Sequence, residues 1–166
     1  MASICYIALG SNLGNRAENL RQALAAIARL PATQVEMVSD FINTAPVGGP
    51  SGQGDYLNAV ARLATDLLPE TLLLALFTIE RDTGRDRNRE IRHGPRIIDL
   101  DILLYDNLFL DNPELEIPHP RMHERIFVLR PLAQIAPELI HPRLGKSILT
   151  LLRACPVEPG VPIQQA

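Results

Sequence analysis

The feature that most restricts the fold is the order in which two hydrophobic patterns follow each other along the chain. Apolar residues three and four apart predict one helix after Asn15, a good N-cap residue, and a second from Pro69, which suits a first helical turn. Short apolar or alternating stretches predict strands at residues 3–9, 35–41, 56–63 and 97–105. The predicted order is β-α-β-β-α-β, which favours an α+β, ferredoxin-like sandwich with both helices on one face of an antiparallel sheet.

Alternation within the strands assigns their residues to faces. Val35 and Met37 alternate with polar neighbours, and every second residue of 57–63 is apolar. In the last strand, Ile98, Leu100, Ile102 and Leu104 are expected to face the core. Between these strands, residues 44–54 are rich in glycine and proline and predict a long loop.

Size and composition favour a single domain. The chain has 166 residues, of which 46% are hydrophobic, enough for one sizeable core. The residues after 105 are expected to add loops and one or two helices, and residues 155–166 a loose tail. We therefore expect one domain over residues 1–166.

Charge and cysteine content exclude several classes of protein. The net charge of −3 provides no positive field for DNA or RNA, and aromatic residues make up only 4% of the chain. Apolar stretches are too short for a membrane span, and the N-terminus is a poor signal peptide. Cys5 and Cys155 have neither disulfide nor metal-ligand spacing. We expect a cytoplasmic protein with no obligate protein partner.

Two carboxylates stand out in the last predicted strand. Asp99 and Asp101 are two residues apart, so their side chains lie on the same face of a strand. Two like charges side by side call for a cation, and Mg²⁺ typically binds one or two carboxylates together with water and substrate phosphates. The alternative is an ordinary solvated sheet face, which is the usual meaning of an isolated Asp-x-Asp.

Positive charge is concentrated just before this pair. Residues 81–96 contain six arginines and three acids, among them Arg85 and Arg87 in a predicted loop. Guanidinium groups bind phosphate oxygens bidentately, so arginines beside two carboxylates suggest a nucleoside triphosphate. Gly94-Pro95-Arg96 connects the cluster to the aspartates. A solvated charged loop remains the alternative reading.

Two further segments carry candidate binding groups. Prolines on both sides restrict His119, and without a cysteine nearby this segment suits phosphate contacts by His119 and Arg125 better than zinc. Tyr56 and Asn58 follow the 44–54 loop and could stack on and hydrogen-bond a heterocyclic ring. Alternatively, they merely begin a strand.

Together these motifs resemble the 6-hydroxymethyl-7,8-dihydropterin pyrophosphokinases, enzymes of the folate pathway. The resemblance runs from Tyr6-Ile7-Ala8-Leu9-Gly10-Ser11-Asn12 to about Pro142. Its most specific parts are residues 94–102, Pro118-His119-Pro120-Arg121-Met122 and Arg125-Ile126-Phe127. It implies an ATP-dependent transferase in which the pterin hydroxymethyl oxygen attacks the β-phosphorus of ATP and AMP leaves.

The resemblance also implies roles for individual residues. Asp99 and Asp101 would hold two Mg²⁺ ions. The residues expected to be catalytic are Arg85, Arg96, His119 and Arg125. The expected ATP-binding residues are Glu80, Arg87, His93, Arg96, Ile102, His119 and Arg125. The expected pterin-binding residues are Thr44, Ala45, Val47, Tyr56, Asn58 and Phe127.

This chain departs from the family pattern at the rim of the expected ATP site, at Phe77, His93, Glu114 and Pro120. Three other functions compete with the diphosphokinase. A regulatory ligand-binding module would not need both the aspartates and the arginines, and an RNA-recognition domain would need more aromatic residues and a basic surface. A metal-dependent nucleotide hydrolase would share the charged groups and differ in its products.

Overall fold

The computed structural model describes residues 1–156, and its elements follow the predicted order. The first part of the chain forms β1 (Ser3–Ser11), α1 (Arg16–Ala28), β2 (Thr33–Val38), β3 (Ile42–Thr44), β4 (Tyr56–Thr65), α2 (Pro69–Asp82) and β5 (Asp99–Tyr105). The second part forms β6 (Leu110–Asp111), β7 (Glu116–Ile117), α3 (Ile126–Ile135) and α4 (Ile148–Ala154). Short 3-10 turns lie at Arg87–Arg89 and Met122–Glu124. The predicted α+β class and the added C-terminal helices are confirmed, and β3 is a short strand that the sequence analysis did not predict.

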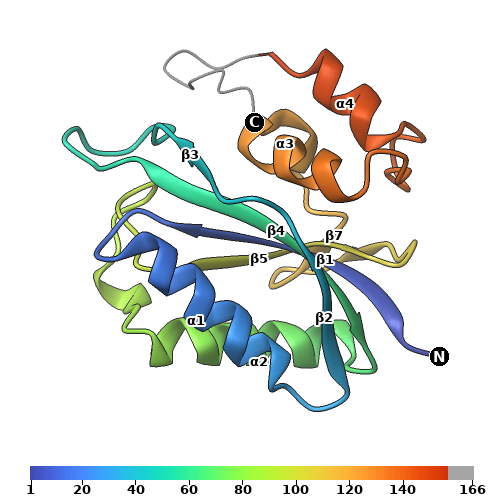
Figure 1. Cartoon of the computed structure of the whole chain (residues 1–166), viewed down its shortest axis with the longest axis horizontal. Helices are drawn as coiled ribbons and strands as arrows, with labels where there is room; N and C mark the ends of the chain where they lie inside the picture. Colours follow the sequence, from blue (N-terminus) through green and yellow to red (C-terminus); the bar gives the residue numbers. More distant parts are fainter. Residues whose placement is uncertain (157–166) are drawn as a thin grey trace.

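The main sheet is antiparallel, with strand order β2-β4-β1-β5 and β3 paired to β4. Helices α1 and α2 cover one face, and α3 and α4 lie across the other (Figure 1). Because α3 and α4 cover only part of that second face, the ends of β1, β4 and β5 beside the long loops are left for a cavity.

The two helices on the first face begin where the sequence predicts. Asn15 Oδ1 accepts a hydrogen bond from the backbone N–H of Glu18 at 3.2 Å, and Pro69 occupies the first turn of α2. Each helix then turns one apolar stripe to the sheet. Leu20 and Leu72, one from each stripe, are fully buried, and each such side chain contributes about 1.5–3 kcal/mol to folding.

The sheet separates two hydrophobic cores. The larger lies between the sheet and α1 and α2 and includes every second residue of β4 from Leu57 to Leu63, as predicted. The smaller lies under α3 and α4 and includes Tyr6, Val60 and Leu129. The second core makes both sheet faces apolar at one end of the strands, which anchors α3 beside the cavity.

Two β-bulges change the predicted facing of residues. An extra residue at Glu36 shifts the pairing of β2, so Met37 pairs opposite Arg62 and is exposed instead of sharing the face of Val35. A second bulge at Leu103 places Leu104 in the core under α3, on the opposite side from Leu100. The bulges thus put Met37 on the face opposite Val35, and they put Leu104, which was expected to face the core, in the smaller core instead of the larger one. Asp99 and Asp101 precede the second bulge and keep their common face.

The described part of the chain ends at residue 156, inside the predicted tail. Cys155 caps α4, and the rest of the tail, from residue 157, lies outside the described residues. Among the helices of residues 1–156, none combines the length and apolarity that crossing a bilayer requires.

Candidate active site

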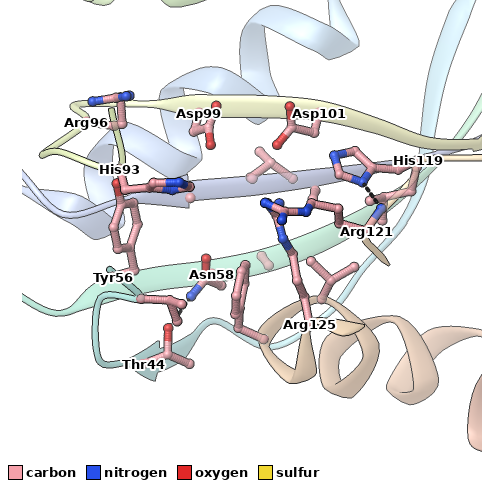
Figure 2. Close-up of a pocket in the computed structure, with 18 of the residues that line it drawn as sticks. Thr44, Tyr56, Asn58, His93, Arg96, Asp99, Asp101, His119, Arg121 and Arg125 are labelled. Carbon is pink, nitrogen blue, oxygen red and sulfur yellow. Dashed lines mark hydrogen bonds between the residues drawn. The ribbon is translucent and has the colours of Figure 1, made fainter. Parts of the chain in front are cut away.

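A cavity of about 340 Å³ opens on the sheet face opposite α1 and α2 (Figure 2). Its walls come from β1, β4, β5, the loops of residues 45–55 and 83–98, and the start of α3. The predicted site residues that line it are Thr44, Ala45, Val47, Tyr56, Asn58, His93, Arg96, Asp99, Asp101, His119, Arg125 and Phe127. Segments far apart in sequence thus meet in a space large enough for a small-molecule ligand.

The two aspartates point from β5 into this cavity (Figure 2). Burial disfavours the charged form of Asp101, and the charge of Asp99 adds to this effect, so the pKa of Asp101 is raised above its usual range. Both aspartates are partly buried, and 38% of the Asp99 side chain is accessible. Paired carboxylates held this way attract a positively charged group.

The donor set fits a magnesium ion better than a transition metal. Within residues 1–156, no three His, Cys, Asp or Glu side chains gather as a metal site. Two carboxylates alone leave most coordination positions to water and phosphate oxygens, which is how Mg²⁺ usually binds beside a nucleotide. Softer metals would need histidine or cysteine ligands that are not grouped here.

Arg85 is not free to reach the cavity. Its guanidinium donates to Glu80 Oε2 at 2.6 Å and to Asp99 Oδ1 at 2.9 Å, and it forms a bidentate pair with Glu90 at 2.7 and 3.0 Å. Burial alone would lower the pKa of Arg85, but Glu90, Asp99 and Glu80 together raise it. Arg85 therefore holds Asp99 in position in this structure, and carboxylates engage four of its five N–H donors.

Glu80 is the buried end of the same network. Its carboxylate accepts hydrogen bonds from Arg85 and Arg87, both at 2.6 Å, and from the backbone N–H of Leu100 at 2.9 Å. Burial raises its pKa, while Arg87 and the Leu100 hydrogen bond oppose this change. The Leu100 bond ties α2 to β5 next to the aspartates, so Glu80 supports the site from behind.

His119 presents a proton donor to the cavity. Its Nδ1 accepts a hydrogen bond from the backbone N–H of Arg121 at 3.1 Å, so the proton of the neutral ring is on Nε2 (Figure 2). Burial, with the positive charge of Arg125, lowers the pKa of His119 to about 4. Near neutral pH, His119 is thus an uncharged donor.

Two arginines beside His119 make no close ion pair with a carboxylate in residues 1–156, although the charge of Arg125 acts on Asp101 and opposes the rise of its pKa. Within residues 1–156, the guanidinium groups of Arg121 and Arg125 form no ion pair, and Arg125 lies 5.7 Å from the ring centroid of Phe127. Both line the cavity (Figure 2). Guanidinium groups in a cavity, next to a neutral N–H donor, are suited to binding a polyanion.

The other end of the cavity has different chemistry. Asn58 Nδ2 donates to Thr44 Oγ1 at 2.6 Å, and the Tyr56 hydroxyl donates to the Gly94 carbonyl at 3.2 Å. Burial, with the charge of Asp99, raises the pKa of Tyr56 to about 12, so the ring stays uncharged. A Cβ on Gly10 would lie only 3.1 Å from Asn58 Oδ1, so glycine leaves this amide its place. Amide and aromatic groups of this kind suit a flat, polar heterocycle.

The structure does not bring every predicted residue into the cavity. Glu80, Arg85 and Arg87 lie behind β5 in the ion-pair network, and the Ile102 side chain belongs to the core on the helical face. Arg121 and Glu124 line the cavity but were not predicted, although Arg121 stands inside the Pro118–Met122 motif. A second unpaired arginine so close to His119 was the signal that could have found it.

The four departures from the family pattern lie in different surroundings. His93 lines the cavity next to Tyr56 (Figure 2), and Phe77 lies under Arg87, with 4.5 Å between the guanidinium carbon and the ring centroid. Pro120 is exposed, and Glu114 lies in the exposed turn between β6 and β7. Only His93 of the four lines the cavity itself.

Comparison with known sequences identifies the family. The sequence model of the family described as 7,8-dihydro-6-hydroxymethylpterin-pyrophosphokinase (HPPK) matches residues 6–137. A 2-amino-4-hydroxy-6-hydroxymethyldihydropteridine pyrophosphokinase of Pseudomonas aeruginosa is 47% identical over 92% of this chain and 92% of its own length. The enzyme of that name from Haemophilus influenzae is 49% identical over 82% of this chain and 84% of its own.

Solved structures agree at the level of the fold. A crystal structure of an HPPK-DHPS in complex with substrates has a TM-score of 0.71 at 14% identity, and one of Plasmodium falciparum HPPK-DHPS with pteroate has 0.72 at 15%. Each match covers 93% of this chain, which spans 43% and 42% of those longer proteins. With the family match, these findings show that the chain belongs to the 7,8-dihydro-6-hydroxymethylpterin-pyrophosphokinase family and is a pyrophosphokinase, a transferase of folate biosynthesis with ATP as its co-substrate.

Proposed function

We propose that this cavity transfers the terminal diphosphate of ATP to the hydroxymethyl oxygen of 6-hydroxymethyl-7,8-dihydropterin. In this reaction the hydroxymethyl oxygen attacks the β-phosphorus, the bond between the α- and β-phosphates breaks, and AMP leaves. The observation that carries the proposal is that Asp99 and Asp101 line one cavity together with the arginines beside His119 and with the amide and aromatic groups around Asn58. An aspartate pair between two such binding ends suits group transfer from a polyanion to a second substrate.

We propose that Asp99 and Asp101 hold two Mg²⁺ ions when the nucleotide binds. When bound, these ions would neutralise the negative charge that develops on the phosphate oxygens. The contribution of the chain itself is to position both carboxylates. Arg85 does this for Asp99 through their 2.9 Å hydrogen bond, and a direct contact of Arg85 with phosphate requires its release from Glu80 and Glu90.

At the phosphate end, we propose that His119 donates from Nε2 and that Arg125 binds phosphate oxygens. Arg96 can do so only after leaving Glu90, with which its Nε pairs at 3.1 Å. Arg87 can reach a nucleotide only after leaving Glu80, and Ile102 only through its backbone, because its side chain lies in the core. His93 then covers the rim between the two substrates. These groups stabilise negative charge and align the triphosphate, so no covalent intermediate is needed.

At the other end, we propose that Tyr56 and Phe127 enclose the pterin ring and that Asn58 hydrogen-bonds its edge. The 2.6 Å bond between Asn58 and Thr44 fixes the amide in one orientation, which prepares it for one tautomer of the ring. Backbone groups of Ala45 and Val47 would complete the recognition of the edge. We also propose that the whole chain acts as one domain, in the cytoplasm, where ATP is available.

Product analysis tests this function. Purified protein is incubated with ATP, Mg²⁺ and 6-hydroxymethyl-7,8-dihydropterin, and the products are identified by mass spectrometry. The proposal predicts AMP and the pterin diphosphate in equal amounts. ADP and phosphate, or AMP formed at the same rate without the pterin, would instead identify a nucleotide hydrolase.

A further inference from the structure

Asn12, directly after β1, connects the two long loops that border the cavity. We call residues 45–55 the pterin loop and residues 83–98 the arginine loop. Asn12 Oδ1 accepts a hydrogen bond from the backbone N–H of Arg96 at 2.7 Å, and its own N–H donates to the Arg96 carbonyl at 3.0 Å. Asn12 Nδ2 donates to Gln53 Oε1 and to the Gly54 carbonyl, both at 3.2 Å. One buried side chain is thus bonded to both loops.

The two loops also contact each other beyond Asn12. Gln53 Nε2 donates to the His93 carbonyl at 2.9 Å, so Gln53 bonds to Asn12 with one end of its amide and to the arginine loop with the other. Gly49 lies against the same carbonyl, and a Cβ at this position would overlap the His93 oxygen. The pterin loop cannot move far without breaking bonds that hold the arginine loop.

Only an amide can make this connection. Asn12 has 6% of its surface exposed, and its side chain uses one acceptor and both donors at once. Aspartate would keep the acceptor but lose the donors, and an apolar side chain would lose both. The proposed function assigns the loops to different substrates, since Ala45 and Val47 of the pterin loop are assigned to the pterin while His93 and Arg96 of the arginine loop are assigned to the nucleotide.

We propose that Asn12 is a positioning residue that couples the binding of the two substrates, so that an ordered pterin loop favours the nucleotide-binding form of the arginine loop and the reverse. This inference rests on the proposed function, because it requires both substrates to bind in this cavity. Binding one ligand orders one loop, and Asn12 and Gln53 transmit that order to the other loop. Coupling of this kind is reciprocal, so each ligand must raise the affinity of the other by the same factor.

Calorimetry measures this factor directly. The dissociation constant of α,β-methylene-ATP with Mg²⁺ is measured with and without saturating 6-hydroxymethyl-7,8-dihydropterin, and the pterin titration is repeated with and without the nucleotide. We expect a factor of about five or more in the wild type, within the range usual for coupled sites. In Asn12→Ala we expect the factor to fall close to one, with smaller changes in the binding of each ligand alone.

Asn19→Ala is the matched control. The Asn19 amide donates to Ser11 Oγ at 3.2 Å and to the Leu13 carbonyl at 2.8 Å, so its loss weakens the same turn without touching either loop. This variant should keep the wild-type factor. Equal factors in the wild type and Asn12→Ala, or an equal loss in Asn19→Ala, overturn the proposal.

Gln53→Ala is a second variant, which changes the pterin-loop partner of Asn12 instead of Asn12 itself. It removes the Gln53 bonds to Asn12 and His93 while leaving β1 intact, so it serves even where Asn12→Ala fails to fold. It should lower the factor as Asn12→Ala does, and an unchanged factor contradicts the inference. The titrations also separate the two ideas, because failure of the nucleotide to bind the wild type, or of the pterin to bind even when the nucleotide is present, contradicts the proposed function instead.

Discussion

At the scale of single residues, the site contains ionisable groups whose charged forms are disfavoured by burial. Neighbouring groups of opposite charge offset part of this free-energy cost. Asp101 is partly buried beside Asp99, and Arg85 offsets the negative charge from behind β5. His119 is kept neutral by burial and by Arg125. The charge state of each group therefore depends on neighbours that come from other parts of the chain.

Replacing Asp101 with asparagine separates function from stability. Because the Asp101 charge is buried beside Asp99, Asp101→Asn should lower turnover by about two orders of magnitude or more while raising the melting temperature of the ligand-free protein at pH 8. Calorimetry and an AMP-release assay check both effects. Near-normal turnover, or unfolding of the variant, contradicts the assigned role.

The protonation of His119 should make stability depend on pH. An unfolded histidine takes up a proton near pH 6.5, but folded His119 does so only at about 4. The folded state is thus favoured fully above pH 6.5 and loses stability as the pH falls from about 6.5 towards 4. The difference in unfolding free energy between wild type and His119→Gln should shrink from pH 7.5 to pH 5. An NMR titration of His119 with a midpoint near 6.5 would argue against this.

The Arg85 network should be more important for folding than its loop position indicates. Arg85→Ala leaves the buried Glu80 carboxylate without one of its two arginine partners, and we expect a loss of about 3–5 kcal/mol in unfolding free energy. Arg89→Ala, in the same loop but with 89% of its side chain exposed, should change it by less than about 1 kcal/mol. Urea denaturation of both variants is the measurement, and equal losses would contradict the network.

At the scale of elements, sequence periodicity identified the helices and strands well because each has one apolar face. The capping by Asn15 and the start of α2 at Pro69 are local effects, and both are confirmed. The bulges at Glu36 and Leu103 were not predictable, since an extra residue in a strand depends on its pairing partner. The pairing of Arg85 with Glu80 and Asp99 was missed for the same reason, because it joins separate elements.

Two glycines of the pterin loop offer a matched test of the contact between the loops. Gly49 and Gly52 both have positive φ, at 75° and 83°, so alanine strains the backbone at either position. Only at Gly49 would the new Cβ meet the His93 carbonyl, while nothing lies within 4 Å of one at Gly52. Gly49→Ala should weaken pterin binding several-fold more than Gly52→Ala in calorimetric titrations. Equal effects would show that the contact with His93 is unimportant.

At the scale of the whole molecule, the cavity exists because α3 and α4 cover only part of one sheet face. The sequence predicted that the aspartates, His119 and the pterin-side residues belong to one site, because each of them lies in a short, recognisable sequence motif. All of them line the cavity. It did not predict that Arg121 lines the cavity or that Asn12 bonds to both loops. These contacts form only when β1, β4, β5 and the loops come together in the folded chain. The site is therefore a property of the assembled sheet.

A crystal structure with Mg²⁺, α,β-methylene-ATP and 6-hydroxymethyl-7,8-dihydropterin tests the central claim most directly. We predict magnesium on Asp99 and Asp101, phosphate oxygens at His119 and Arg125, and the pterin ring against Tyr56. Both substrates should then meet with the hydroxymethyl oxygen facing the β-phosphorus. A nucleotide bound elsewhere, or aspartates without a cation and turned away from the phosphates, would contradict the account.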